Sequence, residues 1–173
     1  GGYTMMLPKE EKIAIATKNE LLASITGLLG GRVSEELYFG EISTGASDDF
    51  SKATKIARSM VTEYGMSDLG PVQLEHKEEG VFLGRDYNKT RNFSDAVALE
   101  IDEEVRKIVN ECYKKATKIL KDNKDLVMLL SNTLIEKETI TKEEIDELVK
   151  TGKLSSKEEK QTENKEETIK EEK

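Results

Sequence analysis

Four acidic residues lie near the ends of two predicted helices, where they could do metal chemistry. Asp48 and Asp49 follow the segment STGAS, and Glu35 and Glu36 lie near the end of the preceding helix. Carboxylates from two adjacent helix ends could meet and ligate a divalent cation. A plainer interpretation is that acids at a helix N-terminus complement its macrodipole, while Glu35 and Glu36 are simply solvated. The residue types alone favour the plainer interpretation and leave both open.

Other residues that commonly carry out catalysis are scarce. The single histidine, His76, lies between Glu75 and Lys77, a setting typical of a surface residue rather than a general base or metal ligand. The single cysteine, Cys112, falls on an apolar helical stripe, where cysteine usually packs as a small hydrophobe. No glycine-rich loop precedes lysine and serine or threonine in phosphate-binding spacing, so the sequence predicts no nucleotide site.

The elements that must position these residues are predicted to be helices, because apolar residues recur at helical spacing along most of the chain. Thr17 with Glu20 predicts a capping box at the start of the first helix, and Thr141 with Glu144 predicts another at the start of the last. The predicted helices cover about residues 17–39, 50–64, 94–120, 124–137 and 142–150, with a loop at 42–47 and an irregular stretch at 66–92.

Two features near the N-terminus depart from the helical pattern. Residues 3–7 are β-prone and precede Pro8, which predicts the end of a short strand. Gly27, Gly30 and Gly31 lie within the first predicted helix, where each costs about 1 kcal/mol relative to alanine. We therefore expect close approach by another element, or a local break, at these glycines.

Composition favours one mainly helical domain followed by a charged tail. Charged residues make up 36% of the 173 residues, aromatic residues 5%, and there are two prolines. The formal net charge is -8 with acids and bases interleaved, so no nucleic-acid-binding face is expected. No apolar run reaches the roughly 18 residues of a membrane span. Residues beyond Thr151 are predicted to be disordered, and the first residues suggest a chain that begins inside a domain.

Three motifs follow one another along the chain. They are GGYTMMLPKE, then LLGGRVSEELYFGEISTGASDDFSKATKIARSMVTEYGMSDLGPV, then FLGRD with a downstream FSD that opens the longest predicted helix. Over about residues 1–149 they closely resemble the peptidase domain of FtsH-type proteases. The resemblance implies a mainly α, helical peptidase domain of FtsH type with a minor β element near the N-terminus. Residues 1–150 would be the C-terminal portion of that domain, and residues 151–173 a disordered charged tail.

The resemblance implies a zinc site to which this chain contributes one ligand. In the family, a His-Glu-x-x-His helix provides two zinc ligands and the catalytic glutamate, and an aspartate after STGAS and one further residue provides the third ligand. That aspartate corresponds to Asp49, with Asp48 where the family often has asparagine. Glu35 resembles a family glutamate near the metal, for which we expect an orienting role. The sequence contains no His-Glu-x-x-His, so we expect an incomplete zinc site and no catalytic residue within it.

The implied chemistry follows from that ligand set. Two imidazoles and one carboxylate leave a fourth zinc position for water, whose acidity the metal raises. The family glutamate takes the proton of that water, which attacks a peptide carbonyl. We expect the 173 residues to be inactive alone.

The resemblance also implies partners that these residues do not themselves reveal. They are an upstream AAA+ module that binds ATP, a transmembrane anchor, a homo-hexameric assembly, and polypeptide substrates from the membrane and from misfolded soluble proteins. The full-length protein would act at the cytoplasmic face of a membrane, and this part would be soluble and without a targeting signal. An alternative from another class is a catalytically dead helical interaction or oligomerisation module, which the absent histidine motif suggests.

Overall fold

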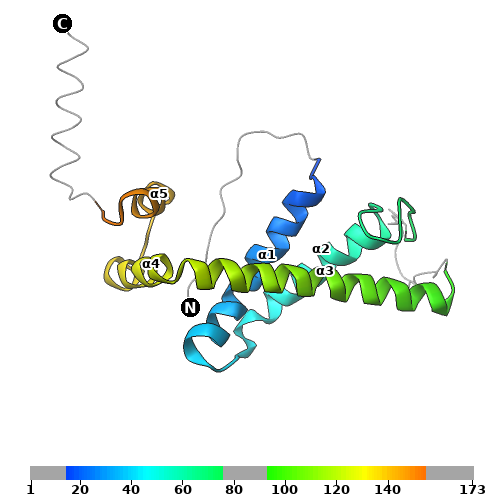
Figure 1. The fold of residues 1–173 in the computed structure, drawn as a ribbon, viewed down its shortest axis with the longest axis horizontal. Coiled ribbons are helices and arrows are strands. Elements are labelled where there is room, and N and C mark those ends of the chain that lie inside the picture. The colour runs from blue at the N-terminus through cyan, green and yellow to red at the C-terminus, as the bar shows by residue number, and fades with distance from the viewer. Residues whose placement is uncertain (1–14, 76–92, 155–173) are drawn as a thin grey trace, which may run out of the picture. The chain divides into compact units, whose positions relative to one another are not determined.

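A computed structural model describes residues 15–75 and 93–154. Within these two ranges the chain forms helices joined by irregular segments, and it forms no strand (Figure 1). The elements are α1 (Lys18–Ser34), η1 (Glu35–Phe39), η2 (Thr44–Ala46), α2 (Ser47–Thr62), α3 (Asp95–Asp122), α4 (Lys124–Lys137) and α5 (Lys142–Thr151). The predicted mainly α fold is therefore confirmed. The predicted strand, His76 and residues 155–173 of the predicted tail lie outside the described ranges.

Helix α1 begins at the capping box that the sequence predicts. The Glu20 N–H donates to Thr17 Oγ1 at 3.3 Å, and the Thr17 N–H donates to Glu20 Oε2 at 2.8 Å. Two backbone donors that the first helical turn leaves without partners are thereby satisfied. The helix then passes into the π-helical turn η1, which ends at Gly40 with φ 68°. Gly40 ends this helical stretch as predicted, because glycine enters the left-handed region without a Cβ penalty.

The local break expected at the three glycines inside α1 is wrong, and the alternative, a close approach by another element, is not found among the described residues. The helix is continuous from Lys18 to Ser34, so there is no break at Gly27, Gly30 or Gly31. A Cβ added at any of the three would meet no heavy atom of a neighbouring element within 4 Å among the described residues. Their small size is therefore not required by a close approach within this part of the chain.

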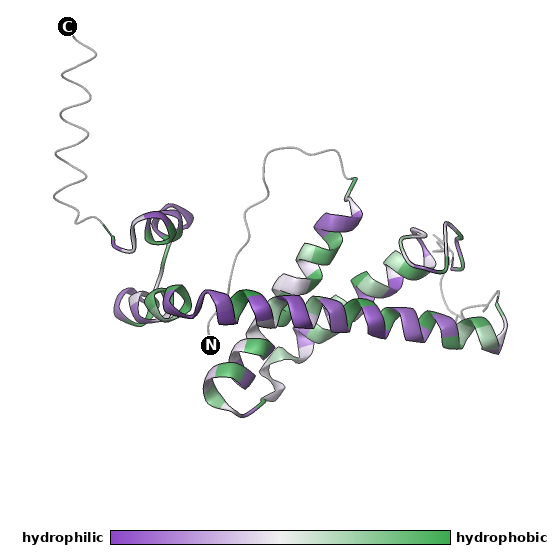
Figure 2. Cartoon of the chain, in the orientation of Figure 1, coloured by the Kyte–Doolittle hydropathy of each residue, from purple (hydrophilic) through white to green (hydrophobic). Residues whose placement is uncertain are grey.

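Helices α1, α2 and α3 enclose the hydrophobic core. Figure 2 shows hydrophobic and hydrophilic residues alternating along α3, the pattern of a helix with one buried side. Cys112 is 3% exposed and its thiol donates towards Leu22 O of α1 at 3.6 Å, which confirms that it packs on the apolar stripe. The buried core residues are Ile25, Leu29, Ala53, Ala57, Met60, Val61, Ile101, Val105, Ile108 and Cys112.

The irregular segment after α2 folds back onto the helices. Gly65 has φ 60°, and a Cβ added there would lie 2.8 Å from Pro71 Cα. Glu75 then accepts hydrogen bonds from Arg58 Nη2 at 2.7 Å and from Thr62 Oγ1 at 3.2 Å. Because Thr62 is fully buried, these contacts fix the end of the segment against α2.

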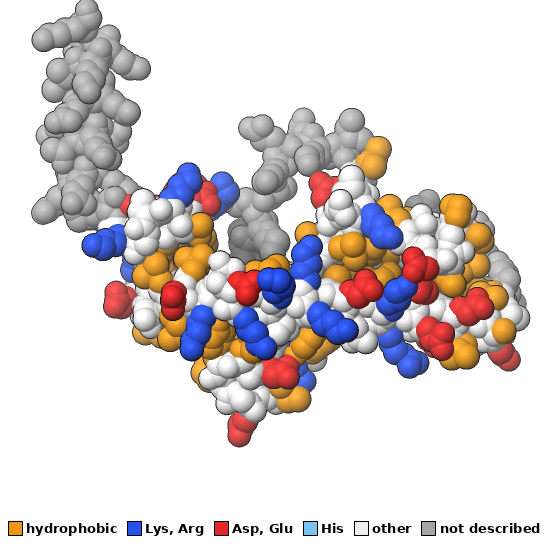
Figure 3. Space-filling model, viewed as in Figure 1, with side chains coloured by type: hydrophobic (Ala, Val, Ile, Leu, Met, Phe, Trp, Pro, Cys, Tyr) orange, Lys and Arg blue, Asp and Glu red, His pale blue; other side chains and the backbone are white. Residues whose placement is uncertain are grey.

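On its other side, the same segment contacts the exposed surface of α3. The Asp68 N–H donates to Glu104 Oε2 at 3.1 Å, and Lys107 forms ion pairs with Asp68 and Glu104. Lysine, arginine and acidic side chains are interspersed along the side of α3 that Figure 3 shows. Helix α3 begins after Ser94, whose Oγ accepts from the Val97 N–H at 3.4 Å, so the predicted N-cap is confirmed.

The structure divides into two compact units, residues 1–119 and 120–173. In the second unit, α4 has the predicted bounds, and α5 begins at the predicted capping box of Thr141 and Glu144. Helix α4 ends at Lys137, and the next residue, Glu138, is a non-glycine residue with φ 62°. Leu148 of α5 is 2% exposed, whereas Ile135 of α4 is 79% exposed.

None of the described helices is long and apolar enough to cross a bilayer. The predicted domain limits, residues 1–150 and 151–173, stay predictions.

Candidate metal-ligand segment

Asp48 and Asp49 lie in the first turn of α2, and the preceding loop determines where that turn begins. Ser43 caps the short helix η2, because its hydroxyl accepts a hydrogen bond from the Gly45 N–H at 3.1 Å. Helix η2 runs directly into α2, and Ala46 at the junction is 7% exposed. The position of Ser43 therefore influences the start of the helix that carries both aspartates.

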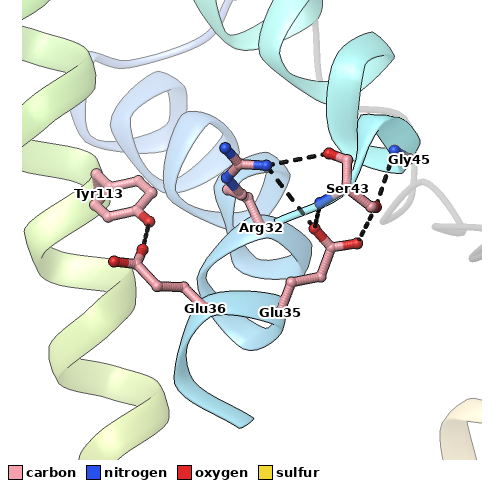
Figure 4. A network of polar contacts seen from close by, with 6 residues as sticks. All are labelled: Arg32, Glu35, Glu36, Ser43, Gly45 and Tyr113. Atoms are coloured by element: carbon pink, nitrogen blue, oxygen red, sulfur yellow. Dashed lines mark hydrogen bonds and ion pairs between the residues drawn. The ribbon is translucent and has the colours of Figure 1, made fainter. Parts of the chain in front are cut away.

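Glu35 of η1 holds Ser43 through two hydrogen bonds (Figure 4). Glu35 Oε1 accepts from the Ser43 hydroxyl at 2.5 Å, and Glu35 Oε2 accepts from the Ser43 backbone N–H at 3.1 Å. These two bonds, led by that of the hydroxyl, lower the pKa of Glu35, and the nearby Arg32 guanidinium adds to the effect. Glu35 is thus an ionised group that fixes the loop before α2.

Arg32, in the last turn of α1, completes the attachment of the loop. Its Nη1 donates to Ser43 O at 3.1 Å and lies 3.9 Å from Glu35 Oε2. Its Cζ lies 5.5 Å from the centroid of the Phe50 ring, within the range of a cation–π interaction. Arg32 and Glu35 together engage both the carbonyl and the N–H of Ser43.

Glu36, the next residue, faces away from this loop and towards α3. The Tyr113 hydroxyl donates a hydrogen bond to the Glu36 carboxylate, and this bond is the largest cause of the raised pKa of Tyr113. The sequence-based prediction of the site did not include Arg32, Ser43 or Tyr113. The spacing of Arg32 and Glu35 at i and i+3 could have indicated their proximity, but no local pattern links Tyr113 to η1.

The two aspartates have different surroundings. Asp48 pairs with Lys52 one turn along α2 at 2.6 Å, and its side chain is 76% exposed. The hydrogen bond from Lys52 lowers the pKa of Asp48. Asp49 is half-buried, and its carboxylate forms no hydrogen bond or ion pair with any residue of the described ranges. Of the two aspartates, only Asp48 therefore has an ion pair with another residue of the described ranges.

The carboxylates of the two helix ends are not gathered around a single point in the described part of the chain. Glu35 contacts Ser43, Glu36 contacts Tyr113 and Asp48 contacts Lys52. No group of three or more histidine, cysteine or acidic residues with the spacing of a metal site occurs within 15–75 and 93–154. Within the described ranges, these carboxylates therefore do not form a metal site by themselves.

Comparison with known proteins places the chain in a family. The family model "Peptidase family M41" matches residues 1–148. Similar proteins include the ATP-dependent zinc metalloprotease FtsH of Acholeplasma laidlawii, 60% identical over 154 residues, and that of Bacillus subtilis, 53% identical over 156 residues. Each alignment covers 89% of this chain and 24% of the relative, so the chain spans about a quarter of the length of these proteins. The family match over nearly the whole chain shows that it belongs to peptidase family M41.

Proposed function

We propose that this chain is part of an ATP-dependent zinc metalloendopeptidase of FtsH type and contributes the aspartate ligand of its zinc ion. The observation that carries the proposal is that the residues matched by the family model include Asp49. The M41 family model matches residues 1–148, and within that range the half-buried Asp49 follows the motif STGAS after one further residue, Asp48. Asp49 supplies one oxygen ligand, and the two histidine ligands and the catalytic glutamate come from a His-Glu-x-x-His segment outside this sequence.

Each residue near the site has a proposed role that its contacts support. Zinc, when bound, supplies Lewis acidity to activate water for attack on a peptide carbonyl. Asp49 holds the metal, and the buried Ala46 and half-buried Phe50 on either side of it keep the first turn of α2 in place. Glu35 does not bind the metal in this proposal. It fixes Ser43 in the loop before α2 and so helps to position the helix turn that carries Asp49.

The remaining parts of the proposal concern the longer protein. We propose that an ATPase module drives unfolding of polypeptide substrates, drawn from membrane and misfolded soluble proteins, and that the protein acts as a homo-hexamer at the cytoplasmic face of a membrane. The name shared by the similar proteins, ATP-dependent zinc metalloprotease, supports the ATPase module and the proteolysis, and the hexamer, the membrane location and the substrate classes follow from the resemblance to FtsH-type proteases. The 173 residues alone are proposed to be inactive, because their sequence holds one histidine and no His-Glu-x-x-His.

The test uses the longer protein in which this chain is joined to its histidine segment. Zinc per protomer is measured by elemental analysis after dialysis against a moderate chelator, for the unaltered protein, Asp49→Asn and Asp48→Asn. We expect one zinc ion in the unaltered protein and in Asp48→Asn, because Asp48 is paired with Lys52 at the surface. We expect Asp49→Asn to lose zinc and peptidase activity, and normal zinc and cleavage in that variant would refute the proposed ligand.

A second candidate is an interaction module without catalytic activity. Helix α4 favours it, because large apolar side chains there are exposed: Met128 by 45%, Leu134 by 49% and Ile135 by 79%. Pull-down of the longer protein by the 173 residues measures this role. Binding that the triple variant Met128→Ser, Leu134→Ser, Ile135→Ser abolishes would support the module, and absence of binding by the unaltered chain would exclude it.

A further inference from the structure

Arg32 contacts both ends of the segment that carries Asp49. We propose that Arg32 is a positioning residue for Asp49, which holds the first turn of α2 so that the carboxylate meets the metal in one orientation. This inference rests on the proposed function, because it assigns the orientation of the ligand that the function requires. Arg32 itself touches neither metal nor substrate in this proposal.

The contacts define the segment from Ser43 to Phe50. At its beginning, Arg32 Nη1 donates to Ser43 O at 3.1 Å. At its end, the guanidinium lies over the Phe50 ring, with Cζ 5.5 Å from the centroid. Asp49 is the residue immediately before Phe50, so the aromatic contact fixes the backbone next to the proposed ligand. One side chain therefore joins the loop before η2 to the first turn of α2.

Burial and charge indicate that these contacts persist. The Arg32 side chain is 19% exposed, and Glu35, 3.9 Å away, supplies the compensating negative charge. Removing a guanidinium from water is costly unless hydrogen-bond and charge partners replace its hydration. The carboxylate and the carbonyl do so here, which favours keeping the guanidinium in this position. Asp49 has no hydrogen bond to another described residue, so its direction is set by the backbone that Arg32 and Glu35 fix.

Arginine is suited to this role in a way that lysine is not. The planar guanidinium can stack on an aromatic ring while its edge donates hydrogen bonds to a carbonyl and a carboxylate. A lysine ammonium keeps the positive charge but loses the planar face and the fork of donors. Arg32→Lys therefore removes the planar stacking surface and the fork of hydrogen-bond donors but retains the positive charge. Arg58→Lys is the matched control, because Arg58 is also partly buried and paired with Glu75 and Asp102, on a later turn of α2.

The experiment measures zinc affinity by competition with a chromophoric chelator in the longer protein that contains the histidine segment. We expect Arg32→Lys to weaken zinc binding by about 10- to 100-fold, the range found when groups that orient metal ligands are removed. Saturating zinc should restore most of kcat, with little change in KM, because the ligand is still present. Arg58→Lys should keep the zinc affinity of the unaltered protein.

A second measurement needs neither zinc nor activity. In the metal-free protein, amide hydrogen exchange over residues 43–50 should be faster in Arg32→Lys and unchanged in Arg58→Lys. If Arg32→Lys does not fold, Phe50→Leu replaces it, because leucine keeps an apolar side chain and removes only the stacking partner. Phe50→Leu is expected to show the same weakening of zinc binding, by several-fold.

The outcomes separate this inference from the function on which it rests. If Asp49→Asn loses zinc while Arg32→Lys and Phe50→Leu bind it as tightly as the unaltered protein, Asp49 is a ligand and the positioning role of Arg32 is wrong. If Asp49→Asn binds zinc normally, the proposed function fails first. Weaker binding in Arg32→Lys and Arg58→Lys alike would indicate general destabilisation, which also overturns the inference.

Discussion

Cys112 illustrates how the surroundings of one side chain set its reactivity. Its thiol is buried between α3 and α1 and donates towards the Leu22 carbonyl. Burial is the largest cause that raises the pKa of this thiol, because the thiolate would lose its hydration. The thiolate is the form that reacts with labelling reagents, so both the raised pKa and the lack of access slow modification.

We predict that a thiol reagent modifies Cys112 in the folded chain much more slowly than in urea, at the same pH. The rate is followed by absorbance with a chromogenic disulfide. Because the folded pKa lies above the unfolded value, the thiol contributes stability that is fully present below about pH 9 and is lost as the pH rises through the folded pKa. Equal rates in the folded and unfolded chain would contradict the buried position.

The acidic residues show which features of the candidate site could be predicted from the sequence and which could not. The resemblance singled out Asp49 from Asp48, and the structure shows a physical difference between them, since only Asp48 has an ion pair within its own helix. The contacts of Glu35 with Ser43 could not be predicted, because they join residues eight positions apart through a turn whose π-helical geometry has no sequence pattern that we could identify. Helix propensity concerns residues that are neighbours along one helix, whereas the contact of Glu35 with Ser43 depends on the path of the chain after η1.

At the scale of helices, most limits follow from capping chemistry that is visible in the sequence. The pairs Thr17 with Glu20 and Thr141 with Glu144 form reciprocal capping boxes, as predicted. The end of α4 is different. Glu138 adopts φ 62° there, a left-handed conformation that costs an L-residue about 1–2 kcal/mol, and glycine is the usual residue at such a position.

We predict that Glu138→Gly stabilises the second unit by about 1 kcal/mol, because relief of the left-handed strain exceeds the extra entropy that glycine loses on folding. Glu136→Gly, inside the same exposed helix, should destabilise it by about 1 kcal/mol. Urea unfolding followed by circular dichroism gives both values. A lower midpoint for Glu138→Gly would mean that the native φ is not left-handed.

At the scale of the whole molecule, hydrophobic periodicity predicts which helix faces are buried but not how the units divide. Apolar residues at helical spacing correctly indicated the buried side of α3 at Val105, Ile108 and Cys112, whereas Leu99 and Ile119 of the same predicted stripe are exposed. The same periodicity did not distinguish α4 from α3, although none of the apolar residues of α4 is buried. Periodicity shows that a face is apolar, and only tertiary packing decides whether another element covers it.

We predict that Met60→Ala and Met128→Ala differ strongly in their effect on stability. Met60 is fully buried in the core, so its truncation should cost about 2–5 kcal/mol in the free energy of unfolding. Met128 is 45% exposed, so its truncation should change that free energy by less than about 0.5 kcal/mol. Denaturant titration measures both, and a similar cost for the two variants would contradict the assignment of the core.

The turn at Gly65 has a consequence for the paths by which this sequence can change. Any other residue at position 65 meets two obstacles at once, a φ of 60° and a Cβ only 2.8 Å from Pro71 Cα. Because the second obstacle is backbone, trimming the side chain of residue 71 does not remove it. A substitution at Gly65 therefore becomes tolerable only after the chain around Pro71 has already moved, for instance by an insertion between 66 and 70. The order of such changes matters, because a single substitution of Gly65 is not tolerated before the backbone around Pro71 has changed.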